Sequence, residues 1–212
     1  MNLHENIFTD IYLNKKWGEN SAVEFFSGSG STIKASQTWV DFVFNFIVSN
    51  SISSLVDGGC GDFTVSNRIL SILKSQDIEI LYTGYECFKT LVELNNKKFP
   101  EATIRHLDMH AQTEKMESAD CLLLKEVMQH WENDQLLRFM NKVIELNLYK
   151  FIIIDNILYE GSNDWMDCNY NKKQTGRALN STLEPLKSFN FQRELVYIQG
   201  NKKSEICTLK LC

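Results

Sequence analysis

Apolar residues along the chain fall into short continuous runs, separated by longer segments in which apolar positions recur at helical spacing. Short runs bounded by polar or glycine residues predict buried strands, and spacing at i, i+3 and i+4 predicts amphipathic helices. We therefore expect strands over 53–57, 79–85, 102–107, 121–124 and 151–154. Helices are expected over 5–16, 35–49, 63–74, 88–98 and 132–147. Short apolar strands that alternate with helices predict a parallel sheet covered on both faces.

The C-terminal part of the chain has a different pattern. Residues 191–199 and 205–211 are strand-like runs that flank the polar sequence Gly200-Asn201-Lys202-Lys203. This pattern predicts a β-hairpin and therefore an antiparallel strand at one side of the sheet. The combined prediction is an α/β fold with seven strands, mostly parallel, with helices on both faces.

A glycine-rich turn joins the first expected strand to the helix that follows it, with the sequence Val56-Asp57-Gly58-Gly59-Cys60-Gly61. Glycines let a ligand approach the backbone closely, and a helix start offers free N–H donors. The turn therefore predicts a cradle for a nucleotide-like cofactor. A nicotinamide fingerprint, G-x-G-x-x-G or A, would need Gly or Ala at position 64, where the residue is Thr64.

Length and composition indicate one domain. A chain of 212 residues with 43% hydrophobic residues can bury a single core, so we expect residues 1–212 to form one domain. Within it, residues 1–38 would form an N-terminal helix and cover segment. The polar segment 156–182 is long for a simple connection and would form an acceptor-binding loop.

Charge and cysteine content limit the classes of binding partner and the cellular compartment that we expect for this protein. The net charge is −5 and lysines occur in scattered pairs, which argues against nucleic acid as a partner. The longest apolar runs have strand length and the first ten residues lack an apolar centre, so neither a membrane span nor a signal peptide is expected. Six cysteines without a C-x-x-C pair indicate a reduced, cytoplasmic protein. A monomer and a homodimer both remain open.

Three parts of the sequence resemble one enzyme family over about residues 17–211. The loop 56–61, the segment Leu122–Trp131 and the terminal hairpin resemble class I S-adenosylmethionine-dependent methyltransferases, which have a Rossmann-like fold. Trp17-Gly18 and Ser27–Ser31 are similar to a bacterial subgroup that methylates small molecules, often surface-glycan building blocks. The family's usual third loop glycine falls at Phe63, where the large side chain would crowd the loop a little.

The resemblance implies S-adenosylmethionine as the cofactor and assigns parts of it to particular residues. Glu86, after the second strand, would accept the ribose hydroxyls, and Asp108 with Met109 would contact adenine. The loop would face the amino-acid tail. The expected cofactor-binding residues are Trp17, Ser31, Asp57, Gly59, Cys60, Gly61, Glu86, Cys87, Asp108, Met109 and Lys125.

Several of these residues also have structural explanations, which we favour less for Glu86 and Asp108. Asp57 could cap the turn through its side chain, and Glu86 or Asp108 could be a solvated acid at the end of a strand. The loop Ser27–Thr32 could be only a connection, and Trp17 could anchor the first helix instead of covering a cofactor.

Methyl transfer from a sulfonium needs little from the protein beyond a positioned acceptor. A hydroxyl acceptor also benefits from a general base, and His130 follows the fourth strand at the ligand-binding edge of the sheet. His130 could instead cap the turn or pack against Trp131. The acceptor is expected to be a sugar or a nucleotide-linked or phosphorylated metabolite, methylated at O or N. Its expected contacts are Tyr12, His130, Asn156, Trp165 and Tyr170.

A metal site is a less favoured alternative. His106, Asp108 and His110 alternate along a strand, and Glu126 and His130 are spaced i, i+4, but Asp108 already has a cofactor role, so no metal is predicted.

Two other functions stay open. A nicotinamide-dependent oxidoreductase or epimerase usually carries a Tyr-x-x-x-Lys pair, which the sequence lacks, and a non-catalytic module would bind S-adenosylmethionine without an acceptor.

Overall fold

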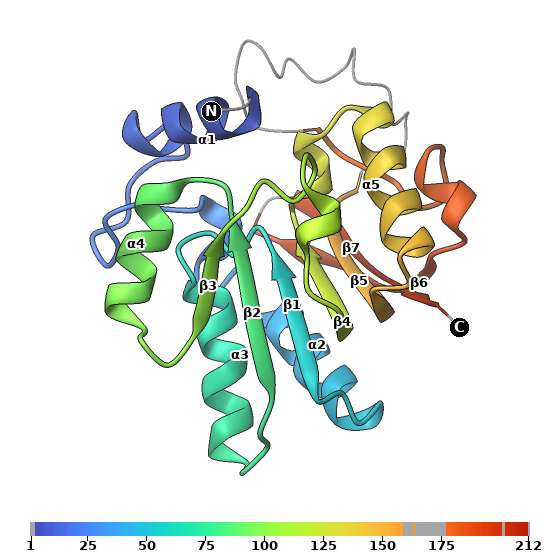
Figure 1. The fold of residues 1–212 in the computed structure, drawn as a ribbon, viewed down its shortest axis with the longest axis horizontal. Coiled ribbons are helices and arrows are strands. Elements are labelled where there is room, and N and C mark those ends of the chain that lie inside the picture. The colour runs from blue at the N-terminus through green and yellow to red at the C-terminus, as the bar shows by residue number, and fades with distance from the viewer. Residues whose placement is uncertain (1–2, 159–162, 164–176, 201, 212) are drawn as a thin grey trace. The chain divides into compact units, whose positions relative to one another are not determined.

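The computed structural model describes residues 3–158, 163, 177–200 and 202–211, and the chain divides into two compact units, residues 1–109 and 110–212 (Figure 1). The strands form a seven-stranded sheet in the order β3-β2-β1-β4-β5-β7-β6. This confirms the predicted α/β fold class. That residues 1–212 form one domain stays a prediction, and each unit is therefore described by itself.

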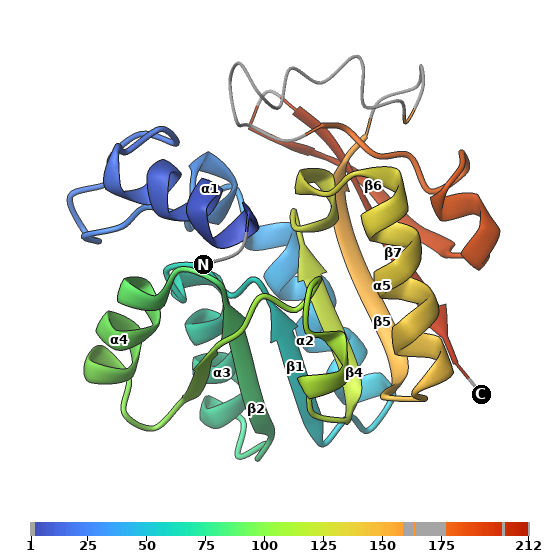
Figure 2. The same cartoon turned by 45° about the horizontal axis from the view of Figure 1, so that its top comes forward.

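The first unit contains three parallel strands. Register pairs such as Val56↔Thr83 and Gly84↔Ile104 bring the carboxyl ends of these strands side by side. Helix α1 lies at that end (Figures 1 and 2). The elements of the unit are α1 (Leu3–Leu13), the 3₁₀ turn η1 (Ser29–Ser31), α2 (Gln37–Ser49), β1 (Ser54–Gly58), α3 (Thr64–Ser75), β2 (Leu81–Glu86), α4 (Lys89–Lys98) and β3 (Thr103–His106).

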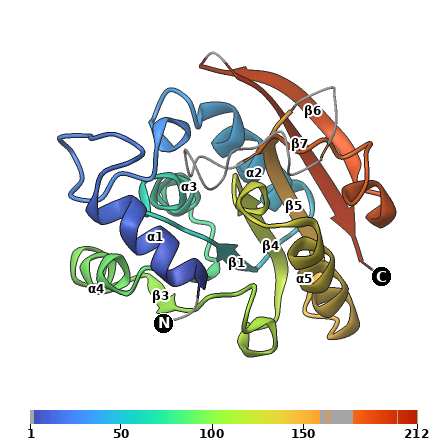
Figure 3. The same cartoon turned by 90° about the horizontal axis from the view of Figure 1, so that it is seen from above.

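The second unit contains one parallel pair of strands and a terminal hairpin. β4 and β5 are parallel, and β7 lies between β5 and β6, antiparallel to both (Figure 3). The elements are η2 (Thr113–Lys115), β4 (Ala119–Lys125), η3 (Met128–His130), α5 (Asn133–Glu145), β5 (Tyr149–Ile157), η5 (Leu186–Phe189), β6 (Gln192–Gln199) and β7 (Lys202–Lys210).

The local sequence explains these elements and their small departures from expectation. α5 buries the apolar stripe Leu136, Met140 and Val143, and the side chains of Glu132 and Gln135 form a capping box at its start. The hairpin turn is shorter than predicted, because Lys202 pairs with Gln199 and so belongs to β7.

Among the described residues, no helix combines the length and hydrophobicity that crossing a bilayer requires.

Phe63 has a backbone conformation that favours glycine. Its φ is +64°, in the left-handed region, and its side chain is 1% exposed. The ring packs against Phe99 at 4.9 Å and Tyr82 at 5.5 Å between ring centroids, in a cluster with Val92 and Ile104. The sequence suggested that this side chain would crowd the glycine turn. Cys60 does contact the same cluster, but the ring mainly fills the core of the first unit.

This geometry predicts an unusual order of stability at position 63. Phe63→Ala should lower the free energy of unfolding by about 3–5 kcal/mol, because it empties a packed aromatic site. Phe63→Gly should be about 1 kcal/mol more stable than the alanine variant, because glycine adopts positive φ without strain. Urea unfolding measures both.

Leu73 is a suitable control, since it is fully buried on α3. There the glycine variant should be the less stable of the two by about 1 kcal/mol. The same order at both positions would contradict the assignment of strain at Phe63.

Candidate functional site

The glycine turn is bound to the end of β2 through its own amides. Gly59 N and Cys60 N both donate to the carbonyl of Tyr85, at 2.8 and 3.0 Å, and Gly61 N donates to Glu86 Oε2 at 3.2 Å. Gly59 and Gly61 have φ values of +74° and +56°, which are accessible to glycine at little cost. The two predicted features, loop and acid, are therefore in direct contact.

Glu86 is a buried carboxylate held by backbone donors. It is 5% exposed, and Oε1 accepts a hydrogen bond from Phe88 N at 2.9 Å while Oε2 accepts from Gly61 N. Burial raises the pKa of Glu86, and the hydrogen bonds from Phe88, Cys87 and Gly61 oppose this shift. The Glu86 carboxylate is thus an anionic hydrogen-bond acceptor at the end of β2, beside the glycine turn. An anionic acceptor of this kind suits the hydroxyl groups of a ribose.

Asp108 and Met109 lie close to the same strand end. Both are buried, and Leu107 N donates to the carbonyl of Glu86 at 3.0 Å, which holds the end of β3 against that of β2. Burial, then the charges of Glu86 and Asp108, raises the pKa of Cys87. The structure thus brings the residues predicted for ribose and adenine together in the first unit.

Asp57 is engaged in structural contacts. It is 6% exposed, and its Oδ2 accepts hydrogen bonds from Ser66 Oγ and from Tyr82 OH, the latter at 2.9 Å. These contacts connect β1 to α3 and β2. A contact between Asp57 and the cofactor tail stays a prediction.

A reciprocal pair of hydrogen bonds joins the N-terminal segment to the glycine turn. Asp62 N donates to Ser27 Oγ at 2.7 Å, and Ser27 N donates to Asp62 Oδ2 at 2.9 Å. Tyr12 OH lies 3.1 Å from Ser27 Oγ. A Cβ at Gly61 would lie 2.4 Å from Ser27 Oγ, so this glycine is required by space as well as by φ. Sequence reasoning noted the loop that begins at Ser27 but did not predict its pairing with Asp62, because polar loop residues far apart in the chain carry no signal of pairing.

Tyr12 and Trp17 belong to an aromatic cluster that includes Phe88, which follows the end of β2. The Tyr12 ring stacks on Phe88 at 5.3 Å with an interplanar angle of 11°. Trp17 contacts Tyr12 edge-on at 5.4 Å and Phe8 at 5.9 Å. This is the geometry expected of a residue that anchors the first helix. Contacts of Trp17 with a cofactor and of Tyr12 with an acceptor stay predictions.

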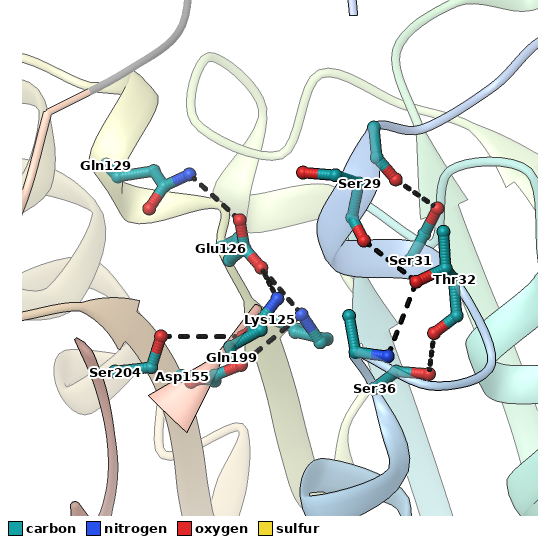
Figure 4. A network of polar contacts seen from close by, with 12 residues as sticks. Ser29, Ser31, Thr32, Ser36, Lys125, Glu126, Gln129, Asp155, Gln199 and Ser204 are labelled. Atoms are coloured by element: carbon teal, nitrogen blue, oxygen red, sulfur yellow. Dashed lines mark hydrogen bonds and ion pairs between the residues drawn. The ribbon is translucent and has the colours of Figure 1, made fainter. Parts of the chain in front are cut away.

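The loop hydroxyls after Trp17 are bonded locally. Ser31 Oγ donates to the carbonyl of Gly28 at 2.8 Å, Thr32 Oγ1 to Ser29 O at 3.0 Å, and Ser36 Oγ to Thr32 O at 2.8 Å (Figure 4). These bonds shape the loop that leads into α2. The predicted role of Ser31 in cofactor binding stays a prediction.

In the second unit, Lys125 belongs to a buried ionic network (Figure 4). Lys125 Nζ lies 2.8 Å from Glu126 Oε1 and 3.3 Å from Asp155 Oδ2. Gln199 Nε2 donates to Glu126 Oε1 at 2.6 Å, and Tyr197 OH donates to Asp155 Oδ2 at 2.9 Å. The network therefore connects the ends of β4 and β5 to β6. Cofactor contact by Lys125 stays a prediction.

One ammonium group cannot fully balance two buried carboxylates, and the pKa values reflect this. Burial lowers the pKa of Lys125, but Glu126 and Asp155 outweigh it and the pKa is raised. Burial raises the pKa of Glu126, but Lys125 and Gln199 outweigh it and lower it to about 2. Burial raises the pKa of Asp155 to about 6, with Glu126 adding to the shift and Lys125 opposing it. Of the two carboxylates, Asp155 is thus the one that holds a proton more readily.

The other predicted acceptor and base residues lie in the second unit or outside the described residues. His130, 8% exposed, ends η3, and its backbone N donates to Val127 O. Asn156 is fully buried near the end of β5. Trp165 and Tyr170 lie outside the described residues, as does most of the predicted acceptor-binding loop. Their roles stay predictions.

The residues considered for a metal do not converge in the described part of the chain. Within it, no group of three or more His, Cys, Asp or Glu side chains is arranged to hold an ion. His106 Nε2 instead lies 3.1 Å from Cys87 O and 3.3 Å from Glu5 Oε1.

Comparisons with known proteins identify the fold. No family model matches the sequence, and no curated protein matches it. Among solved structures, magnesium protoporphyrin IX methyltransferase (ChlM) from Synechocystis PCC 6803, with bound SAM, matches with a TM-score of 0.61 at 14% identity, covering 98% of each chain. The methyltransferase domain of bacterial CtHen1 matches with a TM-score of 0.58 at 14% identity, over 82% of this chain and 100% of that one.

A third similar structure is N,N-8-amino-8-demethyl-D-riboflavin dimethyltransferase (RosA) from Streptomyces davawensis. Its TM-score is 0.59 at 12% identity, and the match covers 84% of this chain and 55% of that one. These likenesses, together with the strand order, show that the chain has the fold of class I S-adenosylmethionine-dependent methyltransferases. The resemblance seen in the sequence is confirmed at the level of the fold.

The contact between Ser27 and Gly61 can be tested by a double-mutant cycle. Gly61→Ala should destabilise the protein through strain at positive φ and through the clash with Ser27 Oγ. In the background of Ser27→Gly, which removes the opposing atoms, the alanine should cost about 1–2 kcal/mol less. Urea unfolding of the four proteins gives this coupling energy, and strictly additive effects would disprove the steric contact.

The raised pKa of Asp155 predicts a pH dependence of stability. In the folded state Asp155 keeps its proton up to about pH 6, whereas the unfolded chain releases it near its ordinary value of 3.8. The unfolded state therefore binds fewer protons between these values, and the free energy of unfolding falls as pH rises through this window. Relative to Asp155→Asn, the wild type should lose on the order of 2–3 kcal/mol from pH 4 to pH 6.

Tyr197→Phe is the matched variant for this measurement. It removes the donor that stabilises the ionised Asp155, so the fall in stability should extend to higher pH. Parallel curves for the wild type and Asp155→Asn over the whole window would contradict the shift.

Proposed function

We propose that this protein transfers a methyl group from S-adenosylmethionine to a small polar acceptor. The observation that carries the proposal is the position of Glu86 within a methyltransferase fold. This buried carboxylate is bound to the amide of Gly61 at the end of β2, and a carboxylate is the acceptor that ribose hydroxyls require.

The residues of the first unit fit the parts of this cofactor. Glu86 would accept from the ribose hydroxyls, Asp108 and Met109 would contact adenine, and the turn Gly59–Gly61 would lie beside the amino-acid tail. Cys87, Trp17 and Ser31 would complete this environment. When bound, the cofactor supplies a methyl group already activated by its positively charged sulfur.

The proposed acceptor is a sugar or a nucleotide-linked or phosphorylated metabolite, including the building blocks of bacterial surface polysaccharide. His130 would accept the proton of a hydroxyl acceptor, a step for which the base must lie within hydrogen-bond distance of that proton. Tyr12, Asn156, Trp165 and Tyr170 would position the acceptor. Methylation at O or N is consistent with these side chains.

Calorimetry with S-adenosylmethionine and its demethylated product tests the cofactor assignment. We expect the wild type to bind both. Glu86→Gln should bind about tenfold or more weakly, because the amide loses charge-assisted acceptance of the hydroxyl pair. Glu145→Gln, an exposed change on α5, should bind like the wild type.

Two results would overturn the proposal. One is the absence of binding in the wild type, and the other is an equal loss of affinity in both variants. Where binding is found, release of the demethylated product in the presence of candidate acceptors measures turnover. An unchanged turnover rate in His130→Ala would remove His130 as the base.

A further inference from the structure

Asn156 is a buried amide whose polar atoms are unsatisfied. Its exposed fraction is 0%, and neither Oδ1 nor Nδ2 has a hydrogen-bond partner among the residues that the structure describes. Asn163 in the same unit shows the usual situation, since its Nδ2 donates to Asn180 O at 2.9 Å and its Oδ1 accepts from Asn180 N at 2.7 Å. Native proteins rarely bury an amide without partners, so Asn156 calls for an explanation.

The charged groups beside Asn156 are already paired. Asn156 lies directly opposite Glu205 of β7, so both side chains lie on the same face of the sheet. Glu205 Oε1 accepts from Ser181 N at 2.6 Å, and Oε2 accepts from Ser181 Oγ at 3.0 Å and from Arg193 Nε at 2.6 Å. Both oxygens of the neighbouring carboxylate therefore have partners, while neither polar atom of the Asn156 amide has one among the described residues.

Asn156 also lies where ligands reach a sheet of this kind. It is the residue before the last of β5, and open α/β sheets bind ligands at the carboxyl ends of their parallel strands. The segment around Leu179 crosses this end, held by Leu179 N to Ile157 O at 2.8 Å and Arg177 N to Gln129 O at 2.9 Å. These hydrogen bonds hold the described part of the segment at this end of the sheet.

We propose that Asn156 is the recognition group of an acceptor site that binds the vicinal diol of a neutral, sugar-like molecule. The inference deepens the proposed function and rests on it for the identity of the ligand as a methyl acceptor. An amide presents one donor group and one acceptor group side by side, and two neighbouring hydroxyls complement both.

Other ligand classes match this pair of groups less well. The dianion of a phosphate ester only accepts hydrogen bonds and would leave Oδ1 unsatisfied, and an ammonium only donates and would leave Nδ2 unsatisfied. A carboxamide could satisfy both atoms, but its nitrogen is not nucleophilic. A hydroxyl beside the bound diol is a nucleophile, so the diol is the class that suits methyl transfer.

The first experiment compares Asn156→Leu with Thr208→Val in the full-length protein. Leucine has nearly the same shape as asparagine and no polar atoms, so Asn156→Leu should raise the melting temperature by about 2–4 °C. Thr208 Oγ1 donates to Glu194 Oε1 at 2.6 Å, so Thr208→Val loses a satisfied bond and should not raise it. A fall in melting temperature for Asn156→Leu would overturn the proposal, because it would show that the amide is satisfied.

The second experiment measures binding by saturation-transfer NMR. The probes are neutral methyl glycopyranosides with cis or trans neighbouring hydroxyls, together with inorganic phosphate, ethanolamine and acetamide. The wild type and Thr208→Val should bind a glycoside, and Asn156→Leu should bind it about tenfold or more weakly. Equal glycoside binding by all three proteins, no glycoside binding by the wild type, or preference for phosphate, ethanolamine or acetamide would each overturn the diol assignment.

Failure of this inference and failure of the proposed function can be told apart. Binding of the demethylated cofactor is measured by calorimetry on the same samples. Asn156→Leu should keep that affinity, since Asn156 has no assigned role in cofactor binding. Loss of cofactor binding in the wild type would remove the proposed function, whereas the melting and glycoside results would still decide whether Asn156 recognises a diol.

Discussion

The first unit depends on one interaction, the burial of the Glu86 carboxylate at the end of β2. A buried carboxylate is costly unless donors surround it, and here the donors are backbone amides from two different segments. Gly61 N brings the glycine turn to the strand, and Phe88 N brings the start of α4 to it. We propose above that this carboxylate also accepts from the ribose of the cofactor. The same charge that organises the backbone can therefore serve a ligand.

The N-terminal segment makes further contacts with the glycine turn and with Phe88. Ser27 and Asp62 exchange hydrogen bonds, and Tyr12 stacks on Phe88, the residue whose amide binds Glu86. Gly61 is thereby restricted from two sides, since its amide serves Glu86 and its missing side chain leaves room for Ser27. The cover segment and the cofactor turn consequently form one connected structure within the first unit.

In the second unit, buried polar groups differ in how far their hydrogen bonds and charges are satisfied. Asp155 is buried, and the single ammonium of Lys125 is shared between Asp155 and Glu126. The pKa of Asp155 is therefore raised to about 6. Glu205 is satisfied by three donors, whereas Asn156 beside it has none among the described residues. Stability alone does not favour an unsatisfied amide. Its presence at a strand end is explained if a ligand completes it.

The sequence by itself determined the fold class and the positions of Glu86, Asp108 and the glycine turn, because periodicity and glycine placement are local properties of the chain. Only the tertiary structure revealed the pairing of Ser27 with Asp62, the core role of Phe63 and the contacts of Asp155 with Tyr197. These contacts join residues distant in sequence, and the types of residue involved are common in loops and strands. Whether a polar side chain such as Asn156 is satisfied depends on every neighbour that folding brings to it, and no local pattern encodes that.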